Sequence, residues 1–547
     1  MKEKLSTLSL EEKIGQLFIC GFHSLEADEQ IKILTKDYHV GGTVYFRRNV
    51  ESVPQLAALS ASLQRLPRSN PDIPLFISID QEGGMVARLD HEGMSRIPGN
   101  MTLGAADDLS LTKATAHLAA EEMSALGINF NFAPCIDVNN NPGNPVIGVR
   151  SFGENPLKVA EHGVAAITGY QEQGVIATAK HFPGHGDTAV DSHRGLASVP
   201  HDKERLNAVE LLPFKHAIAA GVDAIMTAHV IFPAFEPDGI PATLSRKVLT
   251  DLLRVELGYE GVIVTDCLEM HAISKECGIP EGAVQSIEAG ADLVLVSHTL
   301  TDQIAAIEAV IAAVKEGRIN EERINQSVER VLKLKAVRLG TNSADPRDEA
   351  VSAAPVPLTP DSESIPLLTR IAEKSVTLVK RASEMPLDTA KPVLVIWPEL
   401  RHRTEVDEPA VHRYTLADAL TACGVQVELV VVGTQPEATE LEHVLKLSGA
   451  YDQIVAVTYT AEGALPSGQK ELVQELCRLH GDQVIAVSTR NPYDINEFPE
   501  VGTYLCLYEN RSFALDALAK ALIGQIQPTG VLPVGLNSSY PAGYRHF

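Results

Sequence analysis

The chain has 547 residues, of which 45% are hydrophobic, and it carries a formal net charge of -25 at pH 7. This length and composition predict a globular protein of more than one domain. The excess of acidic residues argues against nucleic acid as a partner, because a phosphate backbone binds to a basic face, and it also disfavours an anionic membrane surface.

The N-terminal segment and the cysteines predict a cytoplasmic protein. Ser9 to Glu12 form a capping-box pattern that begins a helix, and we find no apolar stretch suited to a signal peptide or a membrane span. The seven cysteines are scattered and include no Cys-x-x-Cys pair, so reduced structural thiols are expected. Cys267 follows Asp266 without a nearby base, which favours packing over nucleophilic catalysis.

Short apolar runs and the glycines before them predict an N-terminal (β/α)8 TIM-like barrel over residues 1–341. Eight such runs fit the length that a barrel needs, roughly 250 residues or more. Five follow a glycine, the residue that most readily adopts the left-handed conformation ending a helix; these glycines are Gly127, Gly174, Gly221, Gly258 and Gly290. The expected strands are Leu17–Cys20, Thr43–Phe46, Leu75–Ile79, Ile128–Ala133, Val175–Ala179, Val222–Thr227, Val262–Thr265 and Ala291–Val296.

A doubly wound open sheet is the alternative to a barrel. It would show a glycine-rich phosphate turn after its first strand, whereas Leu17–Phe22 is followed by His23-Ser24-Leu25-Glu26. In a barrel, the polar residues that end most strands converge on one face and line a single pocket. These residues are Arg47, Asp80, Asp137, Lys180 with His181, His229, Asp266, and Ser297 with His298.

The segment Lys180–Thr188, followed by Asp191-Ser192-His193, concentrates charge directly after a buried strand. Asp191 and His193 are two residues apart, so in an extended loop their side chains point to the same side and the carboxylate can reach the imidazole. The carboxylate would fix the tautomer of His193 and leave the other ring nitrogen free to exchange a proton near neutral pH. We therefore predict an Asp-His acid/base dyad.

Two other interpretations of this segment stay open. A zinc or manganese site could form from three histidines and two acids, His181, His185, His193, Asp187 and Asp191. Lys180 argues against that site, because an ammonium group beside a divalent cation is electrostatically unfavourable. For His185 and Asp187 we favour a structural role, in which their side chains fold the loop through hydrogen bonds.

Asp266 stands at the tip of the apolar run Gly261–Thr265. A retaining glycosidase needs a carboxylate nucleophile beneath the sugar ring and a proton donor at the leaving oxygen. An acid held rigidly at the end of a buried strand suits the first role. It could equally cap the next helix, and the company of the other strand-end residues favours the catalytic interpretation.

A second domain is expected after the barrel. Residues 342–366 are rich in proline, alanine, serine and acids, a composition typical of an extended linker. Residues 367–547 alternate helical segments with apolar runs and predict a smaller α/β/α sandwich that supports the barrel or binds a partner. The runs are Val393–Ile396, Val425–Val432, Ile454–Val457, Val484–Val487 and Tyr504–Leu507.

Taken together, these motifs resemble the β-N-acetylglucosaminidases, or β-hexosaminidases, of glycoside hydrolase family 3. The resemblance covers roughly residues 1 to 340 and extends more weakly to the two-domain layout. It is carried by Lys180–Thr188, Asp191-Ser192-His193, Val264–Met270, Ile79–Gly84 with Arg88-Leu89, and Arg150–Gly153.

The resemblance implies a double displacement without a cofactor or a metal. Asp266 would attack the anomeric carbon, and His193, supported by Asp191, would protonate the departing oxygen and then activate water. Five charged residues would hold the hydroxyls of a terminal N-acetylglucosamine, with ion pairing around the barrel rim as the alternative role: Asp80, Arg88, Arg150, Lys180 and His181. Asp137, His229 and His298 are second-tier candidates for the pocket lining.

The resemblance also implies the substrate, a muropeptide fragment released during peptidoglycan recycling or a chitin-derived oligosaccharide. A histidine acid/base does not repel an anionic acceptor, so phosphorolysis is a variant of the same chemistry. A metal-dependent barrel hydrolase and a catalytically inactive sugar-binding protein are the alternatives from other classes. The inactive protein would lack Asp266 or the dyad, and all three residues are present. The oligomeric state is not fixed by the sequence.

Overall fold

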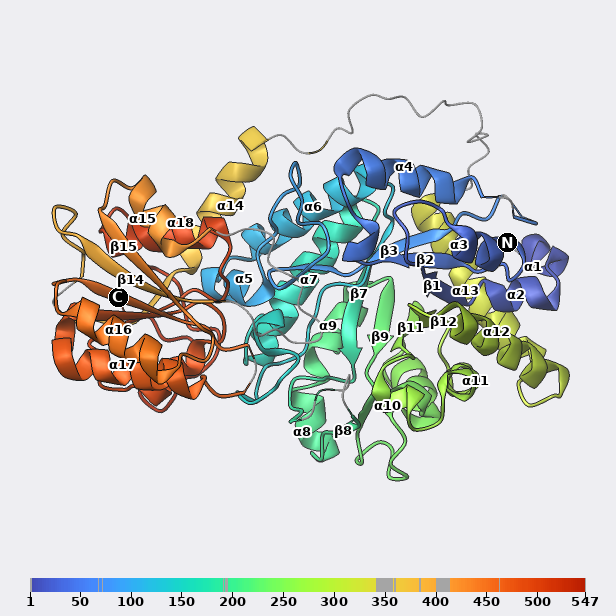
Figure 1. Cartoon of the computed structure of the whole chain (residues 1–547). Coiled ribbons are helices and arrows are strands. Elements are labelled where there is room, and N and C mark those ends of the chain that lie inside the picture. Colours follow the sequence, from blue (N-terminus) through green and yellow to red (C-terminus); the bar gives the residue numbers. More distant parts are fainter. Residues whose placement is uncertain are drawn as a thin grey trace.

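The computed structural model describes residues 2–66, 68–70, 72–189, 191, 195–340, 358, 361–382, 385–399, 414–461 and 463–546. It shows a barrel and a smaller sandwich lying next to each other (Figure 1). None of the described helices is long and apolar enough to cross a membrane.

The barrel is closed and contains the eight predicted strands. Strand β1 pairs in parallel with both β2 and β12, so the ring has no free edge and the open-sheet alternative is wrong. The strands are β1 (Phe18–Gly21), β2 (Gly42–Tyr45), β3 (Phe76–Ile79), β6 (Phe130–Asn131), β7 (Ile176–Phe182), β9 (Ala224–Thr227), β11 (Val262–Cys267) and β12 (Leu293–Val296).

Helices surround this ring. The capping box at Ser9 is confirmed, since its hydroxyl accepts from the Glu12 N–H at the start of α2 (Leu10–Gly15). Positive φ angles are confirmed for Gly127, Gly174, Gly221, Gly258 and Gly290. The other helices are α1 (Lys2–Thr7), α3 (Glu29–Lys36), α4 (Val53–Gln64), α5 (Asn100–Ala106), α6 (Leu109–Ala125), α7 (Pro156–Glu172), α8 (Lys203–Ala208), α9 (Leu212–Ala219), the π-helix η4 (Lys247–Glu256), α10 (His271–Ser274), α11 (Ile279–Ala289), α12 (Leu300–Lys315) and α13 (Glu321–Leu339).

Short elements extend the loops at the carboxyl ends of the strands. A hairpin of β4 (Gln81–Gly83) and β5 (Val86–Ala87) follows β3, and η2 (Gly148–Arg150) follows β6. After β7, the two-residue strand β8 (Ala197–Ser198) pairs with β10 (Val230–Ile231). The remaining short helices of the barrel are η1 (Arg47–Asn49) and η3 (Ala242–Leu244).

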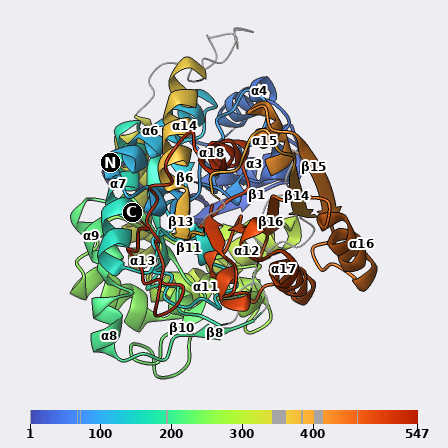
Figure 2. The same cartoon turned by 90° about the vertical axis from the view of Figure 1, so that its left-hand side faces the viewer.

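The sandwich contains a six-stranded sheet in the order β13-β18-β17-β16-β14-β15. Helices α15 and α18 cover one face and α16 and α17 the other, and Figure 2 shows the sandwich in front of the barrel. The elements are β13 (Thr377–Lys380), β14 (Val393–Pro398), α15 (Leu416–Ala422), β15 (Val427–Val432), α16 (Ala438–Ser448), β16 (Ile454–Thr458), α17 (Ser467–His480), η5 (Gly481–Gln483), β17 (Val484–Ser488), η6 (Pro492–Glu497), β18 (Thr503–Cys506) and α18 (Ser512–Leu522).

Five of these six strands match the apolar runs expected from the sequence, and β13 was not expected. This strand pairs antiparallel with β18, against the direction of its neighbours, and directly follows helix α14 (Asp361–Ser375). Residues 361–366 were assigned to the linker, but they form the first part of α14. Further along this helix, Leu368 and Ile371 are buried in the barrel core and hold the helix against the barrel. Residues 342–357, 359 and 360 of the predicted linker lie outside the described residues, and the domain limits stay a prediction.

Candidate active site

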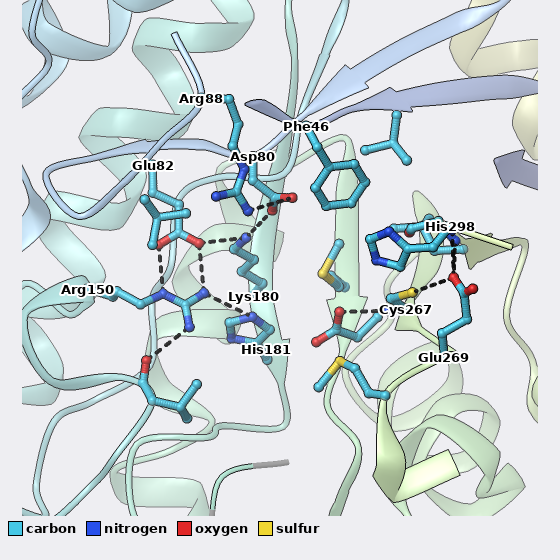
Figure 3. A pocket seen from close by; sticks show the side chains of 18 of the residues that line it. Phe46, Asp80, Glu82, Arg88, Arg150, Lys180, His181, Cys267, Glu269 and His298 are labelled. Carbon is cyan, nitrogen blue, oxygen red and sulfur yellow. Dashed lines mark hydrogen bonds and ion pairs between the residues drawn. The ribbon is translucent and has the colours of Figure 1, made fainter. Parts of the chain in front are cut away.

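A cavity of about 620 Å³ opens at the carboxyl ends of the barrel strands (Figure 3). This volume is typical of small-molecule sites. One side, which we call the charged cluster, consists of Asp80, Glu82, Arg88, Arg150, Lys180 and His181. A second group of lining residues, which we call the opposite wall, consists of Phe46, Asp266, Cys267, Glu269, Met270 and His298, and Figure 3 shows Cys267, Glu269 and His298 across from Arg150. The predicted convergence of strand ends on one pocket is confirmed for these residues.

Ion pairs connect the charged cluster. The Lys180 Nζ lies 2.8 Å from Asp80 Oδ1 and 2.7 Å from Glu82 Oε1. Arg150 binds the Glu82 carboxylate with two nitrogens, Nη2 at 2.7 Å and Nε at 2.9 Å. Arg88 lies 4.0 Å from Asp80. The cluster therefore forms the ion pairs that were the alternative role considered from the sequence, and it also lines the pocket.

Oppositely charged partners keep this buried cluster ionised. Burial acts to raise the pKa of Glu82, but Arg150 and Lys180 outweigh it and hold that pKa well below its usual range. Burial likewise opposes the charge of Lys180, and Asp80 and Glu82 raise its pKa above the ordinary value. Burial also acts to lower the pKa of Arg150, but Glu82 outweighs it and raises that pKa above its ordinary value. All three groups stay charged at neutral pH.

The hairpin that carries Glu82 is held by a tight turn. Gly83 and Gly84 have φ values of +95° and +58°, which residues with a Cβ rarely adopt. A Cβ on Gly84 would lie 2.7 Å from the Cα of Gly99, so the backbone packs closely there. At the start of the hairpin, the Asn131 side chain binds both the N–H and the carbonyl of Gln81 at 3.0 Å.

Asp137 lies behind His181 and orients it. The carboxylate is 2.7 Å from His181 Nδ1 and also accepts the backbone N–H of His181 at 3.1 Å and of His185 at 2.6 Å. Burial acts against this carboxylate, but His181, His185 and these hydrogen bonds lower the pKa of Asp137 to about 2. We assign the His181 proton to Nδ1, which leaves Nε2 as an acceptor 3.5 Å from Arg150 Nη2.

Asp266 lies at the tip of β11 and lines the pocket. Its Oδ1 accepts the backbone N–H of Cys267 at 2.7 Å. The next helix, α10, has Met270 at its N-cap, so the helix-capping alternative for Asp266 is wrong. The Asp266 side chain therefore borders the pocket without capping the next helix.

The rest of the opposite wall is less polar. Burial raises the pKa of the Cys267 thiol to about 12, which supports packing over nucleophilic catalysis. Glu269 accepts the backbone N–H groups of Ser297 and His298 at 2.7 Å each, and thereby fixes the end of β12. The His298 ring lies 4.9 Å from that of Phe46, and burial lowers its pKa.

Two of the second-tier candidates do not line the pocket. Asp137 is fully buried under His181, and His229 is fully buried beside β11. The His229 Nε2 lies 3.0 Å from the Cys267 carbonyl and its Nδ1 lies 2.8 Å from Thr243 Oγ1. The sequence predicted their place at strand ends correctly, but their side chains support neighbouring backbone. His298 lines the pocket as expected.

In the loop after β7, His185 and Asp187 form side-chain hydrogen bonds, as predicted. His185 Nδ1 lies 3.0 Å from Thr188 Oγ1, and Asp187 lies 2.6 Å from His201 Nε2. Among the described residues, the ligand atoms of Asp187 group with His201 and Glu210 and those of His181 with Cys135 and Asp137, so the described members of the predicted metal cluster do not form one group. Asp191 is buried and is not part of the pocket lining, and His193 lies outside the described residues.

No role was expected for Glu82 from the sequence, and the pairing of Asp137 with His181 was not expected either. Glu82 is two residues from Asp80, a spacing that in a strand puts two carboxylates on one side. That spacing was a usable signal. The pairing of Asp137 with His181 joins residues 44 positions apart, which only the barrel geometry reveals.

A parallel barrel whose pocket places charged hydrogen-bonding groups across from a carboxylate at a strand tip is an arrangement suited to enzymes that cleave glycosidic bonds. The N-terminal domain of glycosyl hydrolase family 3 matches residues 9–334. The chain belongs to this family and is a glycoside hydrolase, which confirms the resemblance identified in the sequence.

Several relatives are similar along most of the chain. It is 33% identical to β-hexosaminidase A of Pseudoalteromonas piscicida over 93% of this chain and 91% of that protein. A solved structure of a family 3 β-N-acetylglucosaminidase from Paenibacillus sp. str. FPU-7 is 51% identical, with a TM-score of 0.91 over 97% of this chain and 99% of that one. β-N-Acetylglucosaminidase/β-glucosidase of Cellulomonas fimi is 28% identical over 98% of this chain and 95% of that protein. The two-domain architecture is therefore shared.

Proposed function

We propose that this protein is a retaining exo-β-N-acetylglucosaminidase that removes a terminal N-acetylglucosamine through a covalent intermediate on Asp266. The observation that carries the proposal is that the charged cluster and Asp266 line one pocket. The names of the relatives from P. piscicida and Paenibacillus support the hexosamine as substrate.

The charged cluster suits the binding of sugar hydroxyls. Asp80 accepts hydrogen bonds, Arg88, Arg150 and Lys180 donate them, and the His181 Nε2 offers a further acceptor. Because ion pairs already fix the cations and carboxylates, little side-chain freedom is lost when a sugar binds. Such a preorganised set can hold the ring while its anomeric carbon reacts.

In the first step, an Asp266 oxygen forms a bond to the anomeric carbon as the glycosidic bond breaks, and His193 gives a proton to the leaving oxygen. In the second step, water attacks the same carbon and gives a proton to His193. The bond between that carbon and the Asp266 oxygen breaks, which frees the carboxylate. Asp191 supports the imidazolium form of His193. These roles rest on the family resemblance together with the placement of Asp266 in the pocket.

The primary test is hydrolysis of p-nitrophenyl N-acetyl-β-glucosaminide. We expect Asp266→Asn to lower kcat by roughly ten-thousand-fold, since the amide cannot act as nucleophile. A matched control is Asp292→Asn, which alters a fully buried acid 3.2 Å from Arg330 directly before β12, at the amino end of that strand. Its folded fraction should keep the wild-type kcat. Wild-type turnover by Asp266→Asn would contradict the proposal.

His193 and the metal-dependent alternative are tested with the same substrate class. Turnover by His193→Ala should fall steeply as the leaving group becomes less acidic, because a poor leaving group needs the donated proton. A loss insensitive to leaving-group acidity would remove His193 as the proton donor. Activity should survive EDTA, and adding phosphate shows whether a glycosyl phosphate forms in place of the free sugar.

We further propose a muropeptide as the natural substrate. Its leaving sugar is an N-acetylmuramic acid, with an anhydro or an ordinary reducing end. A comparison of kcat/KM for N-acetylglucosaminyl-anhydro-N-acetylmuramic acid and for N,N′-diacetylchitobiose distinguishes the two substrate classes. A higher kcat/KM for the chitin disaccharide would assign the protein to chitin degradation.

A further inference from the structure

Two residues of the sandwich contact the loops that carry the charged cluster. We propose that Arg511 and Glu509 are positioning residues, through which the sandwich holds the β4–β5 hairpin and so sets the geometry of sugar binding. This inference rests on the proposed function and assigns a role in that function to the second domain.

Arg511 binds the turn of the hairpin. Its Nε donates to the carbonyl of Gly84 at 3.0 Å, and its Nη2 donates to the same oxygen. Its Nη1 lies 3.4 Å from Asp90, three residues after the end of β5, and both side chains are 13% exposed. One guanidinium therefore joins the turn, two residues after Glu82, to Asp90, two residues after Arg88.

Glu509 holds the backbone against which this turn packs. It accepts the N–H of Gly99 at 3.1 Å and is 4% exposed. A Cβ built on Gly84 would lie 3.6 Å from the same carboxylate oxygen, so Glu509 lies close to the turn as well. The Gly84 N–H in turn donates to the carbonyl of Ile97 at 2.9 Å.

The sandwich also holds the partner of Glu82. Val149 precedes Arg150 and is buried in the hydrophobic core of the sandwich together with Met101. Nearby, Asn139 donates to the hydroxyl of Tyr493 at 3.1 Å. Both members of the Glu82–Arg150 pair thus lie one or two residues from a contact with the second domain. A small shift of the sandwich would change their separation.

Not every contact between the domains has this property. Lys374 of α14 lies 2.7 Å from Asp108, which caps α6 and does not border the pocket. This ion pair joins the domains without touching a loop of the site. Removing it is a matched control, because it weakens the attachment of the sandwich to the barrel without changing a contact to the site.

The test uses the full chain with the variants Arg511→Ala, Arg511→Lys, Glu509→Gln and Lys374→Ala. We expect Arg511→Ala to lower kcat/KM for the aryl glucosaminide by roughly ten- to hundredfold, since a misplacement of about 1 Å can cost this much. Arg511→Lys should restore part of the loss, because an amine can still donate to Gly84. Lys374→Ala should retain wild-type kcat/KM, whatever its effect on Tm.

A second readout does not depend on the substrate. Hydrogen–deuterium exchange of residues 81–90 in the free protein should be faster in Arg511→Ala and unchanged in Lys374→Ala. Unchanged exchange, or an equal loss of kcat/KM in Lys374→Ala, would overturn the positioning role. If the wild type does not hydrolyse the glucosaminide, the proposed function fails while the exchange data still decide this inference. If Arg511→Ala does not fold, Glu509→Gln and Arg511→Lys are compared with Lys374→Ala in the same way.

Discussion

The two sides of the pocket are built differently. In the charged cluster, carboxylates and cations alternate so that Glu82 binds both Arg150 and Lys180, and Lys180 also binds Asp80. On the opposite wall, backbone N–H groups orient the two carboxylates. Asp266 accepts the N–H of Cys267, and Glu269 accepts the N–H of Ser297 at the start of the loop after β12. This difference fits the proposed function, in which the charged cluster holds the sugar rigidly and Asp266 on the opposite wall reacts.

The largest effect within the cluster is expected for Glu82→Gln. The amide cannot neutralise Arg150 and Lys180, so both buried cations lose their shared partner and the geometry of the cluster relaxes. We expect kcat/KM to fall by roughly a hundredfold. Asp292→Asn is again the control, because it also removes a buried acid among arginines but lies at the other end of the barrel. Equal activity in the two variants would contradict the contrast between the two sides.

A smaller effect is expected for Asp137→Asn, which acts on the cluster through His181. The amide can accept from the backbone N–H groups, but it no longer attracts the imidazole proton to Nδ1. We expect kcat/KM to fall by roughly tenfold, with the change seen mainly in KM, because the altered tautomer weakens hydroxyl binding. The nitrogen chemical shifts of His181 report the tautomer directly. An unchanged tautomer with reduced activity would remove this explanation.

The pH dependence of stability separates the two sides further. The pKa of Glu82 is lowered in the folded protein from its usual value of 4.5. Its contribution to the free energy of unfolding is therefore full above pH 4.5 and is lost as the pH falls below that value toward the folded pKa. The difference in that free energy between wild type and Glu82→Gln should shrink from pH 6 to pH 3, as measured by urea unfolding at each pH. A difference that grows over this range would contradict the assignment of the ion pairs.

The smallest effect is expected on the opposite wall, for Cys267→Ala. The thiol has a raised pKa and is protonated at neutral pH, so it contributes packing and a weak hydrogen bond to Glu269 at 3.6 Å. We expect kcat/KM to stay within about threefold of wild type, which is the size of a small packing change near a site. A steep loss of activity, or inactivation by a thiol reagent at a rate that rises around pH 7, would reopen a nucleophilic role for Cys267.

The periodic parts of the fold could be predicted from the sequence. The buried barrel strands appear in the sequence as short apolar runs, and glycines with positive φ mark where helices end. Both signals can be read from a few neighbouring residues. Strand β13 and the start of α14 were missed, because an antiparallel partner and a buried helical face depend on distant residues. Proline-rich composition alone pointed to a linker through residue 366.

The members of the site were easier to predict than their partners. Lys180, His181 and Asp266 stand out as polar residues that end apolar runs. The partners of Glu82 and His181 are separated from them by 68 and 44 positions, and no local pattern connects them. For the same reason His229 was placed in the pocket, although its side chain turns toward Thr243 and the backbone of β11.

The most direct test of the account is to trap the glycosyl-enzyme. Incubation with a 5-fluoro derivative of N-acetylglucosaminyl fluoride slows release of the sugar, and mass spectrometry of peptides then identifies the labelled residue. We predict one added sugar per chain on the peptide that contains Asp266, and no label in Asp266→Asn. A label on another residue, or turnover with inversion at the anomeric carbon, would contradict the central claim.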